Sequence, residues 1–315
     1  GPKAREGTIM DANLTEAIER VPLLAAVDKS ALTVERMGGL TNLVFHVTGP
    51  DQDCVLRIPG AGTETYIDRV VELHNARAAA DAGVSPEVLF GDADSGIMVT
   101  RYVPASFTMT PEAFATRTGA PGRAARAFKQ LHGSGQVFRF RFELFAMIDD
   151  YLGHLDRLGA ELPAGYHQVV AEADAVRRVL DRHPTNLAPC HCDPLCENFL
   201  DQNNRMWIVD WEYSGMNDPL WDLGDLSVEA GFDEGQDREL MAAYCAGEPT
   251  AAQFGRMVIY KAMCDLLWTL WGLIQHANDN PAEDFWAYSV GRFERCKVLM
   301  ATPGFAQHLE AVDRG

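Results

Sequence analysis

The dominant hydrophobic period changes near residue 104 of this chain, and this change restricts the folds that the chain can adopt. Between Thr33 and Tyr102 short apolar runs follow a period of two and are separated by turns rich in glycine, proline and aspartate. Beyond Pro104 the apolar residues recur mainly at helical spacing. The 315 residues are enough for two lobes that share a cleft. The sequence therefore predicts an α+β fold in which a small antiparallel sheet precedes a mainly helical lobe.

The first lobe is predicted over residues 1–103. A peripheral helix is expected within residues 11–27, where charged and aliphatic residues alternate at helical spacing. A second helix is predicted over 64–82 and ends at Gly83, because glycine is the usual residue beyond a helix C-terminus. Five strands complete the lobe, at residues 33–37, 43–48, 54–58, 87–90 and 97–102.

The second lobe is predicted over residues 104–315. Its period indicates helices, interrupted by a short hairpin. The helices are expected at 124–132, 143–158 and 166–182 and again from Trp221 onward, with the hairpin formed by 198–200 and 207–209. No internal repeat or low-complexity segment occurs in the sequence.

Charge and cysteine content limit the partners and the compartment of the protein. The net charge of −18 argues against nucleic acid or an anionic membrane as a partner, because both select basic surfaces. It suits a cationic ligand, although acidity also serves solubility alone. Seven cysteines, an odd number, indicate a reduced cytoplasmic protein and not a disulfide framework. The longest apolar run, 266–274, is shorter than the roughly 20 residues of a membrane span. Membrane insertion is therefore not expected, and the oligomeric state is left open.

Three polar residues in and next to the predicted hairpin carry the strongest chemical signal. Asp193 precedes Asn198 by four intervening residues, and Asp210 follows the β-branched run Ile208-Val209. Phosphoryl transfer from a nucleotide needs a carboxylate that accepts the proton of the attacking hydroxyl, and oxygen ligands that hold magnesium. The three residues supply these groups in the order of a kinase catalytic loop, and the lobe order matches a bilobal protein-kinase-like fold. The plainer interpretation, that they are turn formers, leaves this shared order unexplained.

A cluster of soft ligands next to this motif allows a zinc interpretation. Cys190, His191, Cys192 and Cys196 could ligate zinc, but zinc sites of this kind usually combine two spaced pairs and no second pair follows. Adjacent residues would also converge poorly on one tetrahedron. His191 is predicted to brace the loop.

The turn between the first two strands is the predicted phosphate-binding element for ATP. Backbone N–H groups of a glycine turn can approach phosphates without a Cβ in the way. Taken alone, such a turn would be an ordinary hairpin connection. The linker between the lobes is the predicted adenine site. The residues assigned to the nucleotide in these two places are Gly38, Gly39, Thr41 and Asn42 in the turn, and Arg101, Tyr102 and Val103 in the linker.

Arg57 on the third strand is the predicted phosphate-binding cation. Protein kinases carry a lysine at this place, and a guanidinium can also bridge phosphate oxygens. Glu72 on the following helix is the predicted partner that orients Arg57; a plain surface ion pair is the alternative. Whether the arginine fully replaces the lysine is left open at this stage.

The segments 193–198 and 208–218 resemble the choline/ethanolamine kinases, particularly their bacterial branch, within the aminoglycoside-phosphotransferase-like superfamily. The resemblance extends from about residue 32 to residue 299. It implies ATP- and magnesium-dependent phosphorylation of a small amino alcohol. By position, it implies that Asp193 is the catalytic base, that Asn198 and Asp210 are the magnesium ligands, and that Asp222 braces the catalytic loop.

Aromatic residues in the second lobe are predicted to hold the cationic end of the substrate. Trp268 and Trp271 lie three residues apart on one predicted helix, and Phe285 and Tyr288 repeat this spacing on the next. A quaternary ammonium donates no hydrogen bonds and is held by aromatic faces, each worth roughly 0.5–2 kcal/mol. Core packing is the competing interpretation of such pairs. The resemblance places Tyr213, Glu229, Trp268, Trp271 and Tyr288 in this pocket.

The sequence therefore predicts a small-molecule kinase whose substrate is a cationic amino alcohol, with choline first. Kinases for ethanolamine, thiamine or an aminoglycoside remain alternatives. Such substrates carry N–H donors, and a pocket for them would contain more carboxylates. A silent nucleotide- or amine-binding module is a further alternative. The intact set of Asp193, Asn198 and Asp210 argues against it.

Overall fold

The computed structural model describes residues 12–38 and 42–315. Its first part is built on a five-stranded antiparallel sheet in the order β1-β2-β3-β5-β4. The predicted strands are confirmed to within one or two residues at each end. They are β1 (Thr33–Arg36), β2 (Leu43–Thr48), β3 (Asp53–Ile58), β4 (Val88–Gly91) and β5 (Met98–Arg101).

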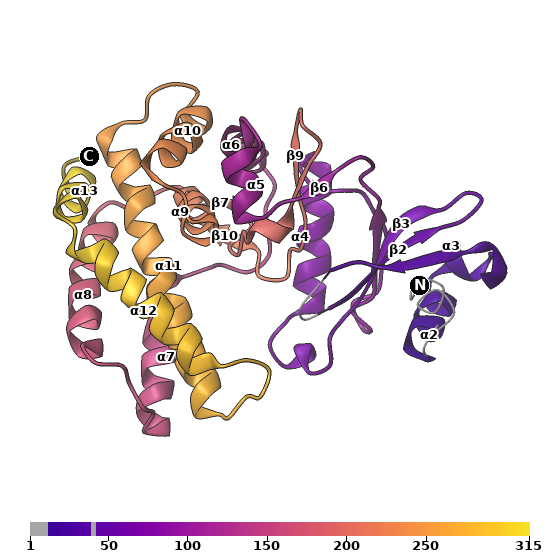
Figure 1. The fold of residues 1–315 in the computed structure, drawn as a ribbon, viewed down its shortest axis with the longest axis horizontal. Helices are drawn as coiled ribbons and strands as arrows, with labels where there is room; N and C mark the ends of the chain where they lie inside the picture. The colour runs from indigo at the N-terminus through magenta and orange to yellow at the C-terminus, as the bar shows by residue number, and fades with distance from the viewer. Residues whose placement is uncertain (1–11, 39–41) are drawn as a thin grey trace.

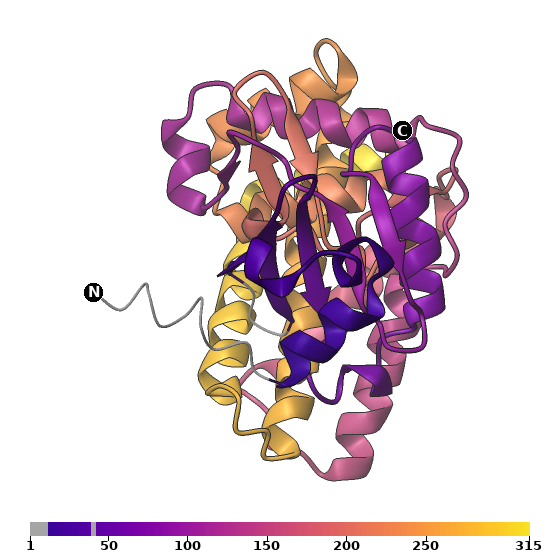
Figure 2. The ribbon, with the colours of Figure 1, turned by 90° about the vertical axis from the view of Figure 1, so that its right-hand side faces the viewer.

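The N-terminal segment forms two helices, α2 (Ala12–Arg20) and α3 (Pro22–Ala25), which lie across one side of this sheet (Figure 2). The apolar face of α2, with Leu14 and Ile18, is buried in a small core with sheet residues that include Val47 and Leu56. Apolar area removed from water stabilises by about 25 cal/mol per Å², so this face explains why a peripheral helix stays on the sheet.

Helix α4 (Arg69–Asp81) begins five residues after the predicted start at Glu64. Asp68 is its N-cap, and its carboxylate accepts the N–H groups of Val70 and Val71. The residues before it form a separate 3₁₀ turn over Thr63–Thr65. The cap decides the boundary, because it satisfies N–H groups that have no partner within the helix. The predicted end is confirmed: Gly83 follows with φ of 82°.

The second part is mainly helical, as predicted (Figure 1). Its helix α8 has the predicted bounds, and α7 starts one residue later than predicted. The helix α6 starts four residues earlier than predicted, and it carries a proline in its first turn, where proline is tolerated. The helices are α5 (Pro111–Thr116), α6 (Ala120–His132), α7 (Leu144–Leu158), α8 (Tyr166–Arg182), α9 (Pro219–Ala230), α10 (Glu234–Cys245), α11 (Ala251–Ala277), α12 (Phe285–Ala301) and α13 (Pro303–Arg314).

Helix α11 lies at the centre of the helical part and contacts α7, α9, α12 and α13 (Figure 1). Among the described residues it is the one helix long and apolar enough to cross a membrane, and 78% of its most apolar window is buried inside the protein. Packing against four helices accounts for this composition, as in the core helix of many large domains.

Five short strands separate the two parts and carry the loops of the predicted active site. The predicted hairpin is present as β8 (Phe199–Asp201) and β9 (Met206–Ile208), with β6 (Phe107–Thr108) at its edge. A second pair joins β7 (Ala188–Cys190) to β10 (Gly215–Asn217). Strands β6, β7 and β10 are absent from the sequence prediction, because each pairs with a strand distant in the chain and not across a short turn as β8 and β9 do.

Candidate active site

The predicted catalytic loop connects β7 to β8 and is fixed by the buried carboxylate of Asp222 on α9. Asp222 Oδ2 accepts the backbone N–H of His191 at 2.9 Å, and Oδ1 accepts that of Cys192 at 2.9 Å. His132 of α6 lies 2.8 Å from Oδ2. Cys192 has a positive φ of 71°, and these contacts hold that strained conformation. The resemblance implies that Asp222 braces the catalytic loop, and these contacts join Asp222 to that loop.

His191 supports the loop from inside, as predicted. Its Nε2 lies 2.9 Å from the carbonyl of Val209, so Nε2 carries the proton, and Nδ1 then accepts the N–H of Asp193 at 3.3 Å. Burial lowers the pKa of His191 and keeps the ring neutral. A protonated ring could not accept the Asp193 N–H.

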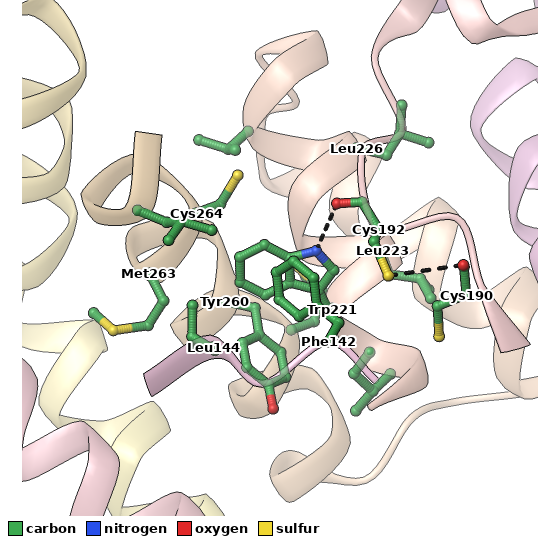
Figure 3. Packing of buried hydrophobic residues seen from close by; sticks show 14 of the residues in the cluster. Phe142, Leu144, Cys190, Cys192, Trp221, Leu223, Leu226, Tyr260, Met263 and Cys264 are labelled. Carbon is green, nitrogen blue, oxygen red and sulfur yellow. Dashed lines mark hydrogen bonds between the residues drawn. The ribbon is translucent and has the colours of Figure 1, made fainter. Parts of the chain in front are cut away.

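Trp221 anchors the same loop to the helical core (Figure 3). Its indole N–H donates to the carbonyl of Cys192 at 3.1 Å, and its ring packs against Phe142 and Tyr260 at centroid distances of 5.0 and 5.5 Å. The indole is 1% exposed, so the bond is made in a place without competing water.

Asn198 ends the loop and is oriented by its own backbone contacts. Its side-chain Nδ2 donates to the backbone carbonyl of Asp193 at 3.2 Å. Its backbone carbonyl accepts the N–H of Val209 at 2.9 Å. Because the amide nitrogen is used within the loop, the amide oxygen is the atom that can bind a metal.

The Asp193 carboxylate lies in a strongly acidic environment. Burial, together with the charges of Glu229 and Asp210, raises its pKa well above the ordinary value, and Arg292 offsets part of this effect. Glu229 lies on α9, and Asp210 lies in the segment after β9. Asp193 is therefore near one predicted metal ligand and near one residue of the predicted cation pocket.

Asp210 follows β9 with φ of 68°, a conformation that few residues other than glycine adopt. It is accessible from solvent. Protein around the carboxylate and the nearby charge of Glu212 raise its pKa to about 7, and Arg57 lowers it in part. A strained backbone that presents a carboxylate with a raised pKa is typical of a functional site.

The predicted contact between Arg57 and Glu72 is present. Arg57 Nη1 and Nη2 donate to the two oxygens of Glu72, the second at 2.8 Å, and Nη2 also donates to the Gly96 carbonyl at 2.8 Å. Both side chains are largely buried, at 13% and 1% exposure, so this is not a surface pair.

Two further members of this ion network were not predicted. Arg69 Nη1 lies 3.0 Å from Glu72 and 2.8 Å from Glu212, and Arg57 Nη1 lies 3.9 Å from Glu212. The spacing of Arg69 three residues before Glu72 was a usable signal. Glu212 stands two residues after Asp210. We call this set the interlobe cluster: Arg57, Arg69, Glu72, Asp210 and Glu212.

The predicted phosphate-binding turn is described only in part, because Gly39 and Thr41 lie outside the described residues. Gly38 is exposed, with open space where a Cβ would stand. Asn42 is buried and joins the two parts of the protein: its Nδ2 donates to Glu212 at 2.5 Å, and its Oδ1 accepts the N–H of Gly60 at 3.0 Å.

The three linker residues have different surroundings. Arg101 pairs with Glu87 on the surface. The ring of Tyr102 stacks on His46 at a centroid distance of 3.7 Å, and Val103 is buried. The linker therefore has one ordered aromatic side chain and one apolar side chain beside the sheet.

The predicted aromatic residues form one continuous group. Trp268 contacts Tyr213 and Trp271, and Trp271 also contacts Phe285 and Tyr288. All four contacts are edge to face, at centroid distances of 5.4 to 6.4 Å. Four of the five rings retain some exposure, and Phe285 is buried. Three separate segments of the chain thus supply one aromatic wall.

Glu229 reaches this wall together with a cation that was not predicted. Arg292 of α12 donates to Glu229 at 2.6 Å and lies over the ring of Tyr288 at 5.8 Å from its centroid. Arg292 also lies 3.2 Å from Asp265. We call the charged group here the pocket cluster: Asp225, Glu229, Asp265, Arg292 and Arg295.

The cysteines of the motif are all free thiols with separate contacts. Cys190 Sγ contacts the carbonyls of Asn217 and Asp218, and Cys192 Sγ contacts those of Cys190 and Gly215. Within the described residues the four soft side chains of the zinc interpretation do not form one metal-ligating group.

Oxygen donors converge at the interlobe cluster. Atoms of Glu72, Asp210 and Glu212 lie within 4.8 Å of one another. Three carboxylates face two guanidiniums there, which leaves one negative charge to be balanced. Magnesium prefers oxygen ligands and fits such a donor set, with the amide oxygen of Asn198 as a further ligand.

A two-lobed fold with an acidic loop of this kind defines a kinase-like phosphotransferase. The profile of the phosphotransferase enzyme family matches residues 33–254, and the chain belongs to this family. The structure of a choline/ethanolamine kinase family protein from Mesorhizobium loti is 62% identical, covers 96% of this chain and 99% of its own, and superposes with a TM-score of 0.88. The protein-kinase-like fold predicted from the sequence is thereby confirmed.

Two structures of LicA are also similar. Choline kinase LicA from Streptococcus pneumoniae is 26% identical, covers 91% of this chain and 98% of its own, and has a TM-score of 0.72. LicA in complex with AMP is 27% identical, covers 85% and 91%, and has a TM-score of 0.67. The resemblance to choline/ethanolamine kinases is confirmed by these similarities.

Proposed function

We propose that this phosphotransferase moves the γ-phosphoryl group of ATP to the hydroxyl of a small cationic amino alcohol, with choline as its substrate. One observation carries the proposal: Asp193 lies close enough to both Asp210 and Glu229 for their charges to raise its pKa. This supports a base that is close both to a proposed site for a metal–nucleotide complex and to a proposed site for an organic cation. A kinase for a cationic alcohol needs both sites next to its base.

The nucleotide binds between the two lobes in this proposal. Its adenine lies along the linker 101–103, and its phosphates lie under the turn 38–42 and beside Arg57. Arg57 is already oriented by Glu72, so it loses little freedom on binding. LicA, which was solved in complex with AMP, supports nucleotide binding by this protein.

Asn198 and Asp210 would hold magnesium. The ion supplies charge neutralisation at the phosphates when it is bound. The carboxylate of Asp210 is suited to this role, because the surrounding protein and the charge of Glu212 raise its pKa, and a bound cation would stabilise its ionised form.

Asp193 positions the substrate hydroxyl and accepts its proton. The hydroxyl oxygen forms a bond to the γ-phosphorus, while the bond from that phosphorus to the bridging oxygen of ADP breaks. A carboxylate with a raised pKa is a better proton acceptor than an ordinary one. The bracing of its loop by Asp222 keeps the distance to the hydroxyl short.

The ammonium group of the substrate rests against the wall of Tyr213, Trp268, Trp271 and Tyr288. A solved relative named choline kinase and a 62% identical member of the choline/ethanolamine kinase family support choline over unrelated alcohols. Because ATP is the donor and all seven cysteines are free thiols, we place the protein in the cytoplasm.

A coupled ADP-release assay tests the proposal. Purified protein with ATP and magnesium is given choline, ethanolamine, their N-methylated intermediates, thiamine and an aminoglycoside panel. The expected result is the highest kcat/KM with choline and none with aminoglycosides. Absence of turnover with every amine would overturn the proposal and favour a binding module.

A further inference from the structure

The carboxylate that the resemblance assigns to the substrate ammonium is already bound to a cation of the protein. Glu229 Oε1 accepts from Arg292 Nη2 at 2.6 Å, and the two side chains are 13% and 10% exposed. An ion pair that is this well buried keeps its geometry, because neither partner regains water by separating.

Arg292 is held in this place from several sides. Its Nη2 lies 3.2 Å from Asp265 Oδ1 and 3.6 Å from Cys264 Sγ of α11. The guanidinium lies 5.8 Å from the ring centroid of Tyr288, one turn earlier on its own helix. It therefore contacts the same aromatic residue that is proposed to hold the substrate cation.

The remaining carboxylates of the pocket cluster leave little free negative charge. Asp265 accepts hydrogen bonds from Nε and Nη2 of Arg295, at 2.7 and 2.6 Å. Asp225 is fully buried and accepts only the thiol of Cys264 at 3.2 Å; its Oδ2 has no hydrogen-bond partner within the described part of the chain. Burial and the charge of Glu229 raise the pKa of Asp225, which favours its neutral form.

A pocket of this kind distinguishes two classes of ammonium. A primary ammonium has three N–H donors and loses their water on binding, so it needs acceptor oxygens that are not already in use. A quaternary ammonium has no N–H donor and needs only aromatic faces. Sites that leave donors unpaired reject the ligand that carries them.

From these contacts we propose that Arg292 determines substrate specificity: it occupies the Glu229 carboxylate and so makes the pocket select a quaternary over a primary ammonium. This inference rests on the proposed function. It adds a residue and a mechanism of discrimination to it, since Arg292 acts on the substrate through the carboxylate that it neutralises.

The test compares KM for ethanolamine with KM for choline in four proteins. Relative to the wild type, Arg292→Met frees Glu229 and is expected to lower the ratio of the two KM values about tenfold. Arg292→Lys keeps the charge and is expected to leave the ratio within about twofold. The double variant Arg292→Met/Glu229→Gln removes the freed carboxylate and is expected to return the ratio to that of the wild type.

Lys297→Met is the matched control on the same helix. Lys297 pairs with the exposed Glu294 and, within the described residues, forms no ion pair with Glu229, so its loss should leave both KM values unchanged. Binding is measured independently of turnover by the change in tryptophan fluorescence on adding each amine, since Trp268 and Trp271 line the pocket. Circular dichroism melting checks that each variant is folded.

The outcomes separate the two proposals. If the wild type turns over neither amine, the proposed function fails. If the wild type phosphorylates choline and a folded Arg292→Met protein keeps the wild-type ratio, the role of Arg292 is overturned. An equal fall of KM for both amines would also overturn it, because Arg292 would then exclude every cation without discrimination.

Discussion

The interlobe cluster and the pocket cluster have the same composition, three carboxylates and two guanidiniums, but different surroundings. In the first, the carboxylate in surplus is Asp210, which is accessible from solvent and has a pKa of about 7. In the second it is Asp225, which is fully buried. A surplus charge that solvent reaches can be balanced by a bound cation, whereas a buried one is balanced by a proton. The same set of three carboxylates and two guanidiniums thus suits a metal site in the interlobe cluster and a group without net charge in the pocket cluster.

The position of Asp193 near both clusters gives the largest expected effect. Asp193→Ala removes the proton acceptor and is expected to lower kcat about a thousandfold, while ATP affinity stays close to the wild-type value. Steady-state kinetics and nucleotide titration calorimetry check this. Glu197→Ala, an exposed carboxylate on the same loop, is the control and should stay within about threefold. Near-normal turnover in Asp193→Ala would remove Asp193 from the mechanism.

The ionisation of Asp210 in the interlobe cluster is tested by the dependence of kcat/KM on pH. Asp210 must be ionised to hold magnesium, and its pKa is about 7, so kcat/KM for the magnesium–ATP complex should fall as the pH drops below about 7. Glu212→Gln removes the charge that raises this pKa. The acidic limb should therefore move to lower pH by roughly half a unit. Glu87→Gln, which breaks the exposed pair with Arg101, should leave it in place. A shift to higher pH would contradict this account of Asp210.

The protonation of the buried Asp225 carboxylate in the pocket cluster is tested by measuring the free energy of unfolding. This prediction has the smallest expected effect. The pKa of Asp225 is raised in the folded state by burial, Glu229 and Asp193, and lowered in part by the Cys264 thiol and Arg292. The stabilising contribution of such a group is present at low pH and is lost as the pH rises through the folded pKa. Asp225→Asn, which cannot ionise, should raise the free energy of unfolding by about 1 kcal/mol at pH 8 and by less at pH 5.

Urea unfolding at the two pH values measures this difference. The exposed Asp156→Asn serves as the control and should change stability by less than about 0.5 kcal/mol at either pH. An equal change at pH 5 and pH 8 for Asp225→Asn would show that the pKa of Asp225 is not raised in the folded protein.

The secondary structure was predictable where the pattern is long. Helix α8 has the predicted bounds, and the five strands of the sheet differ by one or two residues. The start of α4 was misplaced, because Thr63–Thr65 form a separate 3₁₀ turn and the cap at Asp68 decides where the helix begins. The strands β6, β7 and β10 were missed, because each exists through pairing with a strand that is distant in the chain, whereas the equally short β8 and β9 form a local hairpin.

The sequence by itself determined the chemistry of the catalytic loop and the pairing of Arg57 with Glu72. Asp193 and Asn198 are close in the chain, so their order and spacing are visible in the sequence, whereas distant residues such as Asp222 and Trp221 hold the loop in place. The roles of all predicted site residues remain predictions until the variants are measured.

Only the tertiary structure decided which charges meet across long separations. Glu212 accepts hydrogen bonds from Asn42 and Arg69, which lie 170 and 143 residues earlier in the sequence. Arg292 donates to Glu229, which lies 63 residues earlier. Such contacts depend on how the lobes and helices pack, and no local pattern encodes them. The physical reason is that a charge is balanced by whichever partner the fold brings within a few ångströms, and Coulomb attraction does not depend on sequence distance.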